Sequence, residues 1–292
     1  MILVTGGTGF VGSHIVQRLA REKITTRCLV REGSKVSKLK DYGVELAFGD
    51  MTDKESLKKA LNGAETVIHL VGIIVEKKGA TFEIIHTQGT RALVDTCKEV
   101  GVKRFIYISA LGARENAQSR YHITKWEAEQ SIIKSGMEYV IFRPSIMIGE
   151  GGEFITMLSG IIQNAPVIPV IGAKSKLQPI YVENTVDCVL SSLVRPEIKN
   201  KIFDIGGPDQ ISYRELYITL AQVLGIKKPV VEIPVWMVWP AAYILENIME
   251  KPALTTQQLM MLKEDNICDM REIQKVFGLQ LMSYKDALNT FI

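Results

Sequence analysis

Short apolar runs and longer amphipathic stretches take turns through the first 150 residues of the chain. The stretches between the runs repeat apolar positions at helical spacing. The pattern predicts strands over 2–5, 26–31, 44–48, 66–71, 105–109 and 139–143, and helices over 11–22, 54–61, 81–100 and 120–135. Because apolar strands that alternate with helices are buried on both faces, this order indicates an α/β fold with a doubly wound parallel sheet. Ligands of such sheets bind at the carboxyl ends of the strands.

The rhythm changes after this first part. Glycine and proline cluster over 149–152 and 165–172, and strand signals become sparse. Two capping boxes predict helices here, namely Ser212 with Glu215, opening a helix toward Leu224, and Thr255 with Gln258, opening one through Leu262. We therefore divide the chain into a sheet-bearing part, 1–150, and a smaller, mostly helical cap, 151–292. The cap is expected to interleave with the core rather than to form an independent domain.

Three glycines, Gly6, Gly9 and Gly12, follow the first predicted strand and precede the first predicted helix. A strand that turns at once into a helix presents unpaired backbone N–H groups and the positive end of the helix dipole, which together bind a pyrophosphate. Glycine is needed where the turn is tight and where backbone approaches the phosphate. The Gly-x-x-Gly-x-x-Gly spacing, with Thr8 and Phe10 in its gaps, resembles that of the extended and atypical short-chain dehydrogenase/reductases, whose fold is of the Rossmann type.

The end of the second predicted strand bears on which dinucleotide binds. NAD-binding versions of the fold usually carry an acidic residue there, which holds the ribose hydroxyls. This chain has Val30 at that position and Arg31 next to it. A guanidinium grips the 2′-phosphate of NADP with paired hydrogen bonds, whereas a carboxylate repels it. The electrostatics therefore favour NADP(H) over NAD(H). Two alternatives stay open: Glu32 offers a carboxylate for a ribose hydroxyl, and Arg31 is a solvated loop residue that contacts no cofactor.

The resemblance implies further cofactor contacts at later strand ends. Asp50 and Met51 follow the third strand, where relatives carry an acidic residue against the adenine amino group and a neighbour that lines the ring. Asp50 is equally suited to cap the next helix. Backbone at Val71 and Gly72 is expected beside the cofactor, and His69 is interpreted as a packed strand histidine rather than a base. The predicted cofactor-binding set is Gly6, Thr8, Gly9, Phe10, Val11, Gly12, Arg31, Asp50, Met51, Leu70, Val71, Gly72, Ser109, Tyr121, Lys125, Pro144 and Ser145.

A Tyr-x-x-x-Lys pair, Tyr121 and Lys125, follows the fifth predicted strand. Residues i and i+4 share one face of a helix, so the phenol and the ammonium can act at one site. A free tyrosine has a pKa of about 10, and a nearby ammonium lowers that pKa toward the range of a catalytic acid and base. The usual third group is a hydroxyl that holds the substrate oxygen. Ser109 is the candidate, but the catalytic hydroxyl of the epimerases matches Ala110.

Two later stretches also resemble the extended members. Residues 142–149 are similar to the segment that flanks the nicotinamide, and Pro144 ends the sixth strand so that the backbone turns toward the cofactor. Residues 178–184 resemble the strand beside the substrate pocket. Asn184 stands where the family usually has an acidic residue.

The stretches 119–129 and 254–266 narrow the resemblance to the atypical group that includes the 39-kDa accessory subunit of respiratory complex I. Two functions follow from that resemblance. The first is an oxidoreductase or epimerase that transfers hydride on a carbonyl, hydroxyl or sugar-nucleotide substrate, with Tyr121 and Lys125 as acid and base and Ser109 as a third catalytic residue. The alternative is a non-catalytic dinucleotide-binding subunit of a respiratory assembly. The intact Tyr121 and Lys125 pair favours the enzyme.

Composition and charge exclude several other classes of protein. Of the 292 residues, 47% are hydrophobic and 23% charged, as is ordinary for a globular protein. The net charge of +3 is too small to indicate a nucleic-acid partner. The four cysteines form no metal-ligand spacing, so we expect reduced thiols, no metal site and a cytoplasmic location.

Two segments are candidate contact surfaces. The apolar run 233–245 holds two prolines and is too short to span a bilayer. A core helix is one interpretation of this run. The other is contact with a membrane surface or a lipid-like substrate, because residues such as Trp236 and Tyr243 suit an interface. The long helix predicted over 81–100 is a candidate for pairing in a homodimer, which ordinary packing explains equally well.

Overall fold

The computed structural model describes residues 1–249, 252 and 254–292. The chain divides into two compact units. The first unit comprises residues 1–117, 121–143 and 185–203, and the second comprises 118–120, 144–184 and 204–292.

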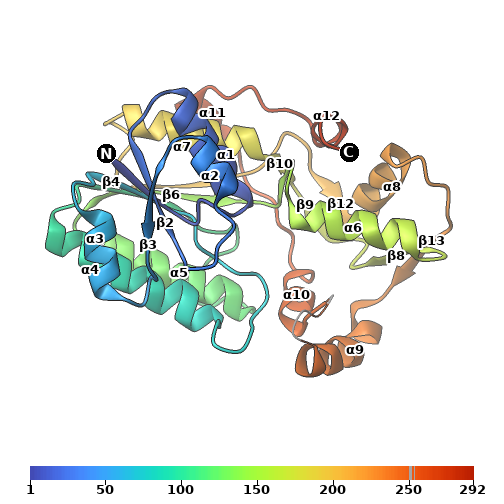
Figure 1. Cartoon of the computed structure of the whole chain (residues 1–292). Helices are drawn as coiled ribbons and strands as arrows, with labels where there is room; N and C mark the ends of the chain where they lie inside the picture. Colours follow the sequence, from blue (N-terminus) through green and yellow to red (C-terminus); the bar gives the residue numbers. More distant parts are fainter. Residues whose placement is uncertain (250–251, 253) are drawn as a thin grey trace. The chain divides into compact units, whose positions relative to one another are not determined.

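The first unit is built on a seven-stranded sheet with the order β11-β6-β5-β4-β1-β2-β3 (Figure 1). The strands are β1 (Ile2–Thr5), β2 (Thr26–Val30), β3 (Glu45–Phe48), β4 (Thr66–His69), β5 (Arg104–Ile108), β6 (Glu138–Pro144) and β11 (Lys201–Ile205). Neighbours from β6 to β3 pair in parallel, and Ile2 lies opposite Thr26 on one side and Thr66 on the other. The strand order switches between β1 and β4, so the carboxyl ends of these two strands form the expected ligand crevice.

Helices cover both faces of this sheet (Figure 1). They are α1 (Phe10–Arg21), α2 (Ser37–Asp41), α3 (Lys54–Leu61), the π-helix η1 (Glu83–Gln88), α4 (Gly89–Val100), α5 (Arg120–Ile133) and α7 (Val182–Val194). Leu57, Leu93 and Ile132 of α3, α4 and α5 are fully buried in one cluster with Leu3 and Phe105 of the sheet. Each such side chain contributes about 1.5–3 kcal/mol of hydrophobic free energy, which fixes α5 firmly on the sheet.

The second unit consists of short strand pairs and helices. The pairs are β7 (Met147–Ile148) with β10 (Ile180–Tyr181), β8 (Ile168–Ile171) with β13 (Val230–Ile233), and β9 (Lys176–Leu177) with β12 (Ile211–Ser212). The helices are α6 (Glu153–Asn164), α8 (Tyr213–Val223), α9 (Val235–Ile248), α10 (Thr256–Met261), α11 (Arg271–Phe277) and α12 (Tyr284–Asn289). Both predicted capping boxes are present, at the starts of α8 and α10.

The structure confirms the doubly wound sheet and differs from the sequence prediction in three places. The helix expected over 81–100 begins as a π-helix, η1, before α4. Strand β11, at the edge of the large sheet, was not predicted. The core-helix interpretation of 233–245 is wrong, because Ala242 is the one residue of α9 that is buried. Within the described residues no helix is both long and apolar enough to cross a membrane.

Candidate functional site

The glycine loop joins β1 to α1 with backbone packed against backbone. Gly6 has a φ of +77°, and a Cβ there would lie 3.0 Å from the carbonyl carbon of Leu70. At Gly12 a Cβ would lie 2.1 Å from the carbonyl oxygen of Gly6, so no side chain fits at this position. Gly9 is the N-cap of α1 and makes no side-chain cap bond, which leaves N–H groups of the first turn available. This cradle fits a dinucleotide pyrophosphate.

Of the other loop residues predicted to hold the cofactor, Thr8 is exposed, and Phe10 and Val11 are half-buried at the start of α1. Leu70 and Val71 are half-buried after β4, and Gly72 is exposed. These residues therefore lie along the carboxyl ends of β1 and β4, where the strand order switches.

Arg31 and Asp50 follow β2 and β3, which are neighbours in the sheet. Arg31 is exposed. Asp50 accepts hydrogen bonds from the backbone N and the Oγ1 of Thr52, at 2.9 and 2.7 Å. These bonds, with a smaller contribution from the charge of Arg31, hold the pKa of Asp50 below its usual range. Asp50 does not cap α3, because the N-cap is Asp53, whose carboxylate accepts from Glu55 N.

Lys125 is buried at the carboxyl end of β5. Its Nζ donates a hydrogen bond to the carbonyl oxygen of Ile108 at 2.9 Å and lies 4.8 Å from the centroid of the Tyr107 ring. A Cβ at Gly72 would lie 3.2 Å from this nitrogen, so the glycine lets the backbone after β4 approach the ammonium. Burial lowers the pKa of Lys125 to about 8, and the charge of Glu129 opposes that shift.

Tyr121 is enclosed by three aromatic rings that meet it edge to face. The ring centroids of Phe82, His86 and His122 lie 5.8, 5.5 and 5.3 Å from that of Tyr121. Burial raises the pKa of Tyr121 to about 12. The sequence argument expected Lys125 to lower this pKa, whereas desolvation by burial raises it.

Ser109 is engaged in a buried network that sequence reasoning missed. Its Oγ donates a hydrogen bond to Glu129, a completely buried carboxylate. Glu129 also receives two hydrogen bonds from Arg143, one of them from Nε at 2.9 Å. Because Glu129 lies four residues after Lys125 and eight after Tyr121, helical spacing already placed it on the same face of α5. The Ser109 hydroxyl is thus committed to Glu129, and the next residue, Ala110, offers none.

The π-helix η1 places His86 behind Tyr121. His86 Nε2 accepts the N–H of Ile73 at 3.0 Å, so the proton of the neutral ring lies on Nδ1 and is donated to Thr124 Oγ1, also at 3.0 Å. Burial is the main reason that the pKa of His86 falls to about 2. His86 therefore anchors the backbone just after Gly72 to helix α5, a role that the residue pattern did not indicate.

His69 is a packed strand histidine, as the sequence predicted. It is completely buried, and its two ring nitrogens lie 2.6 Å from Thr5 Oγ1 and 2.9 Å from Thr90 Oγ1. Burial lowers its pKa to about 3, so the ring stays neutral. With both nitrogens engaged, His69 has no free group for acid–base chemistry.

Met51, Pro144 and Ser145 are the remaining predicted cofactor residues, and Asn184 comes from the stretch expected beside the substrate pocket. Ser145 Oγ lies 2.6 Å from Asn266 Oδ1 and accepts from Gln178 N at 3.3 Å, all within the second unit. Pro144 ends β6. Met51 packs against Gly89 at the start of α4, where a Cβ would lie 3.1 Å from its methyl carbon. Asn184 donates to the carbonyl oxygen of Gln280 at 3.1 Å, which is a structural contact.

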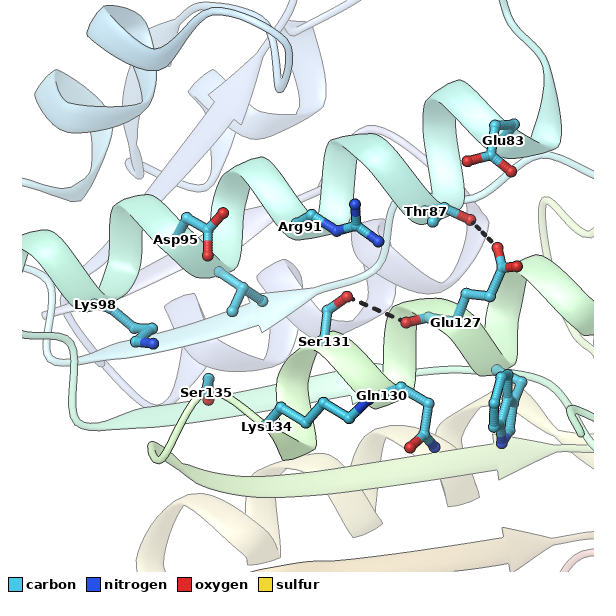
Figure 2. A pocket seen from close by; sticks show the side chains of 12 residues that line it. Glu83, Thr87, Arg91, Asp95, Lys98, Glu127, Gln130, Ser131, Lys134 and Ser135 are labelled. Atoms are coloured by element: carbon cyan, nitrogen blue, oxygen red, sulfur yellow. Dashed lines mark hydrogen bonds between the residues drawn. The ribbon is translucent and has the colours of Figure 1, made fainter. Parts of the chain in front are cut away.

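A cavity of about 480 Å³ lies between the outer sides of α4 and α5 (Figure 2). Thr87 Oγ1 donates to the Glu127 carboxylate at 2.7 Å, and Ser131 Oγ donates to the Glu127 carbonyl oxygen at 3.2 Å. Its rim mixes acidic and basic side chains, among them Arg91 and Asp95. The cavity lies on the helical surface rather than at the strand ends, so it is separate from the site around Tyr121.

Comparison with known proteins places this site in a family. The family model described as NAD(P)H-binding matches residues 6–159. The ceramide reductase of Caulobacter vibrioides is 28% identical over 234 residues, which cover 80% of this chain and 74% of the relative. Alpha subcomplex subunit 9 of the mitochondrial NADH dehydrogenase (ubiquinone) of Arabidopsis thaliana is 32% identical over 224 residues, which cover 73% of this chain and 55% of the relative. The chain thus spans little more than half the length of that mitochondrial protein.

Among solved structures, the UDP-glucose 4-epimerase of Thermotoga maritima with UDP-glucose superposes with a TM-score of 0.77. The alignment covers 98% of this chain and 96% of the epimerase at 20% identity, which shows a common fold. Together these matches confirm the resemblance inferred from the glycine loop and the C-terminal stretches. The chain belongs to the NAD(P)H-binding family.

Proposed function

We propose that the protein is an NADP(H)-dependent reductase that converts a carbonyl compound into an alcohol. The observation that carries the proposal is the state of Tyr121, a phenol on the Lys125 face of α5 whose pKa is raised to about 12. At neutral pH only about one such phenol in 10⁵ is ionised. Tyr121 is therefore suited to donate a proton and poorly suited to remove one. Reduction of a carbonyl needs a donor, whereas oxidation of an alcohol needs a base.

The glycine loop, the strand ends at Leu70, Val71 and Gly72, and the Lys125 ammonium are proposed to hold the cofactor. When bound, the reduced dinucleotide supplies the hydride. Tyr121 releases its phenolic proton to the substrate oxygen as the carbonyl carbon gains the hydride, so a C–H and an O–H bond form while the C=O π bond breaks. The phenolate then regains a proton from solvent. A protonated Lys125 on the same helix face stabilises that phenolate.

Ser109 supports the site in this proposal rather than binding the substrate oxygen. Its hydroxyl already donates to Glu129, so a bond to substrate would leave a buried carboxylate oxygen with one donor fewer. Such a loss costs roughly 1–3 kcal/mol. Tyr121 therefore acts on the substrate oxygen without a second hydroxyl.

The preference for NADP(H) rests on Arg31. Its side chain is exposed just past β2, where a bound adenosine ribose would lie in this fold, and no acidic residue ends that strand. The competing charges nearby are the exposed Glu32 and Asp50, and the Asp50 carboxylate already accepts two hydrogen bonds from Thr52. The guanidinium is thus available for a 2′-phosphate.

The substrate class is inferred from the relatives and the protonated phenol. The relative named ceramide reductase matches 80% of this chain, which favours reduction of a carbonyl. The competing substrate class is a sugar nucleotide, as in the solved epimerase with UDP-glucose. That epimerase shares its fold with this chain at 20% identity.

One observation favours a second function, that of a dinucleotide-binding accessory subunit. The serine at the end of β5 is committed to Glu129 and the following residue is Ala110, so the usual catalytic hydroxyl is missing. The mitochondrial relative named above is a subunit of a multi-subunit enzyme. In this function the cofactor would stabilise the chain without turnover.

The two functions separate in one experiment with Tyr121→Phe. The purified chain is supplied with NADPH and a panel of ketones and aldehydes, and NADPH consumption is followed. The reductase proposal predicts that the variant keeps the wild-type affinity for NADPH while its turnover falls by about 10²–10⁴-fold, the usual contribution of a positioned proton donor. Turnover that survives the loss of the phenol would contradict it. Tight NADPH binding with no turnover on any carbonyl in the wild type would support the accessory subunit.

A further inference from the structure

Helix α9 carries an exposed apolar face that the proposed function does not use. Trp236 and Ile248 are 74% and 77% exposed, and Met237, Tyr243 and Ile244 are also exposed. At 100° per residue these positions fall on one side of the helix, together with the exposed residues Pro240, Ala241 and Asn247. The opposite side holds Ala242, the one buried residue of α9. The exposed face is therefore continuous along the whole helix.

This face carries no charge. The single ionisable carboxylate within α9 is Glu246, which lies on the other side of the helix. Glu246 accepts hydrogen bonds from Thr256 N at 2.8 Å and from Thr256 Oγ1 at 3.0 Å, at the start of α10. The Glu246 carboxylate thus interacts with the first turn of a neighbouring helix, where the helix dipole favours a negative charge. On the exposed side the Asn247 amide donates to the Tyr243 carbonyl oxygen at 2.6 Å, which lowers the cost of its transfer into an apolar medium.

One basic side chain borders the face. Lys263 Nζ lies 5.0 Å from the centroid of the Trp239 ring, beside the exposed face. The nearby carboxylate of Glu232 is neutralised by Arg214, at 3.0 Å. Tryptophan and tyrosine beside lysine is the composition of helices that lie in the boundary between lipid headgroups and acyl chains.

A helix that is hydrophobic on most of its surface is usually buried in a protein core or in lipid. The described residues of the chain do not bury α9 in a core. Its 14 residues give a length of about 21 Å at 1.5 Å per residue, which is short of the roughly 30 Å of bilayer hydrocarbon.

From these observations we infer that α9 docks the protein on the surface of an anionic lipid bilayer, with its exposed face among the upper acyl chains and Lys263 at the headgroups. The helix lies in the plane of the membrane and does not span it. This inference is independent of the proposed reductase activity.

The test uses the full chain and vesicles of phosphatidylcholine, alone or mixed with phosphatidylglycerol. Two of the three tryptophans of the chain, Trp236 and Trp239, lie in α9. Insertion should shift their emission to the blue and make it sensitive to quenching by brominated acyl chains. Sedimentation with vesicles should be stronger with phosphatidylglycerol and weaken at high salt, because Lys263 acts by screened attraction.

The double variant Trp236→Ser with Ile248→Ser should lower partitioning by at least about tenfold, since each side chain contributes more than a tenfold factor when buried in an apolar medium. Val194→Ser is the matched control, because Val194 is 75% exposed but lies at the end of α7. It should leave partitioning unchanged. Lys263→Gln should weaken binding to the anionic vesicles and leave binding to phosphatidylcholine unaffected.

Three outcomes would overturn the inference. The first is no partitioning into either kind of vesicle. The second is equal partitioning of the double variant and the wild type. The third is a wild type that sediments as a dimer without vesicles while the double variant sediments as a monomer, which would make the face a contact between two copies of the chain. Unchanged NADPH binding and thermal unfolding of the variants verify that the fold is intact.

Discussion

Replacing Glu129 should destabilise the protein far more than replacing an exposed carboxylate. Glu129 is completely buried, and it accepts hydrogen bonds from Ser109 and from both Nε and Nη2 of Arg143. Glu129→Ala removes the buried carboxylate to which the Arg143 guanidinium and the Ser109 hydroxyl donate. Removing one partner of a buried ion pair costs about 3–5 kcal/mol. For a chain of this size the midpoint of thermal unfolding should fall by roughly 2–4 °C per kcal/mol, or about 6–20 °C in total.

Glu138→Ala is the control. Glu138 lies on β6, the strand that carries Arg143, and pairs with Lys199 at 3.0 Å, but its side chain is 42% exposed. Exposed ion pairs are worth about 0–1 kcal/mol, so this variant should unfold near the wild-type midpoint. Urea denaturation of the three proteins measures the difference. Equal losses in Glu129→Ala and Glu138→Ala would refute the buried network.

A second readout separates charge from packing. Glu129→Gln keeps the shape of the side chain and removes its charge. Because the charge of Glu129 opposes the lowering of the pKa of Lys125, the variant should lower that pKa below about 8. If the ammonium assists Tyr121, the alkaline limb of the pH–rate profile moves to lower pH. A limb that stays in place would show that Glu129 acts on stability alone.

Three further predictions follow from the site. Gly12→Ala should abolish dinucleotide binding or unfold the loop, because its Cβ would lie 2.1 Å from the Gly6 oxygen, and a thermal-shift titration with NADPH measures the loss against Gly160→Ala, whose added Cβ meets open space. Arg31→Ala should weaken NADPH and NADP at least about fivefold more than NADH and NAD, by loss of a charge-assisted bond of about 1–3 kcal/mol, and equal weakening of all four dinucleotides would contradict the 2′-phosphate argument. Stability should fall on acidification by up to about 1.4 kcal/mol per pH unit for each of His69 and His86. The unfolded histidines titrate near 6.5, whereas the folded ones titrate at about 3 and about 2, so the loss begins below about pH 6.5. His69→Gln should reduce this slope in urea titrations at several pH values.

Local patterns predicted the features that depend on neighbours in sequence. Strand β1, the glycine loop and α1 follow from an apolar run, three glycines and an amphipathic stretch, and the capping boxes at Ser212 and Thr255 stand where spacing put them. Features that depend on distant residues were missed. Strand β11 joins the sheet beside β6, and nothing in its own residues signals that pairing.

The site shows the same division. Helical spacing placed Tyr121, Lys125 and Glu129 on one face of α5. The hydrogen-bond donors to Glu129 come from distant segments, because Ser109 follows β5 and Arg143 lies on β6. The π-helix that aims His86 at Ile73 has no signature in the residue pattern. Burial raises the pKa of Tyr121, and two of the rings around it, those of Phe82 and His86, come from a segment distant in sequence. The sequence argument therefore favoured the effect of Lys125 over that of burial.

The most direct test of the proposed reduction follows one atom. NADPH carrying deuterium at the transferable position of the nicotinamide is incubated with the protein and a carbonyl substrate found by the NADPH-consumption screen, and the alcohol product is analysed by mass spectrometry. The account predicts one deuterium bound to the former carbonyl carbon with the wild-type protein, and no labelled alcohol with Tyr121→Phe although that variant still binds NADPH. Labelled alcohol formed equally by both proteins would contradict the role of Tyr121 as proton donor, and an unlabelled product from the wild type would contradict hydride transfer altogether.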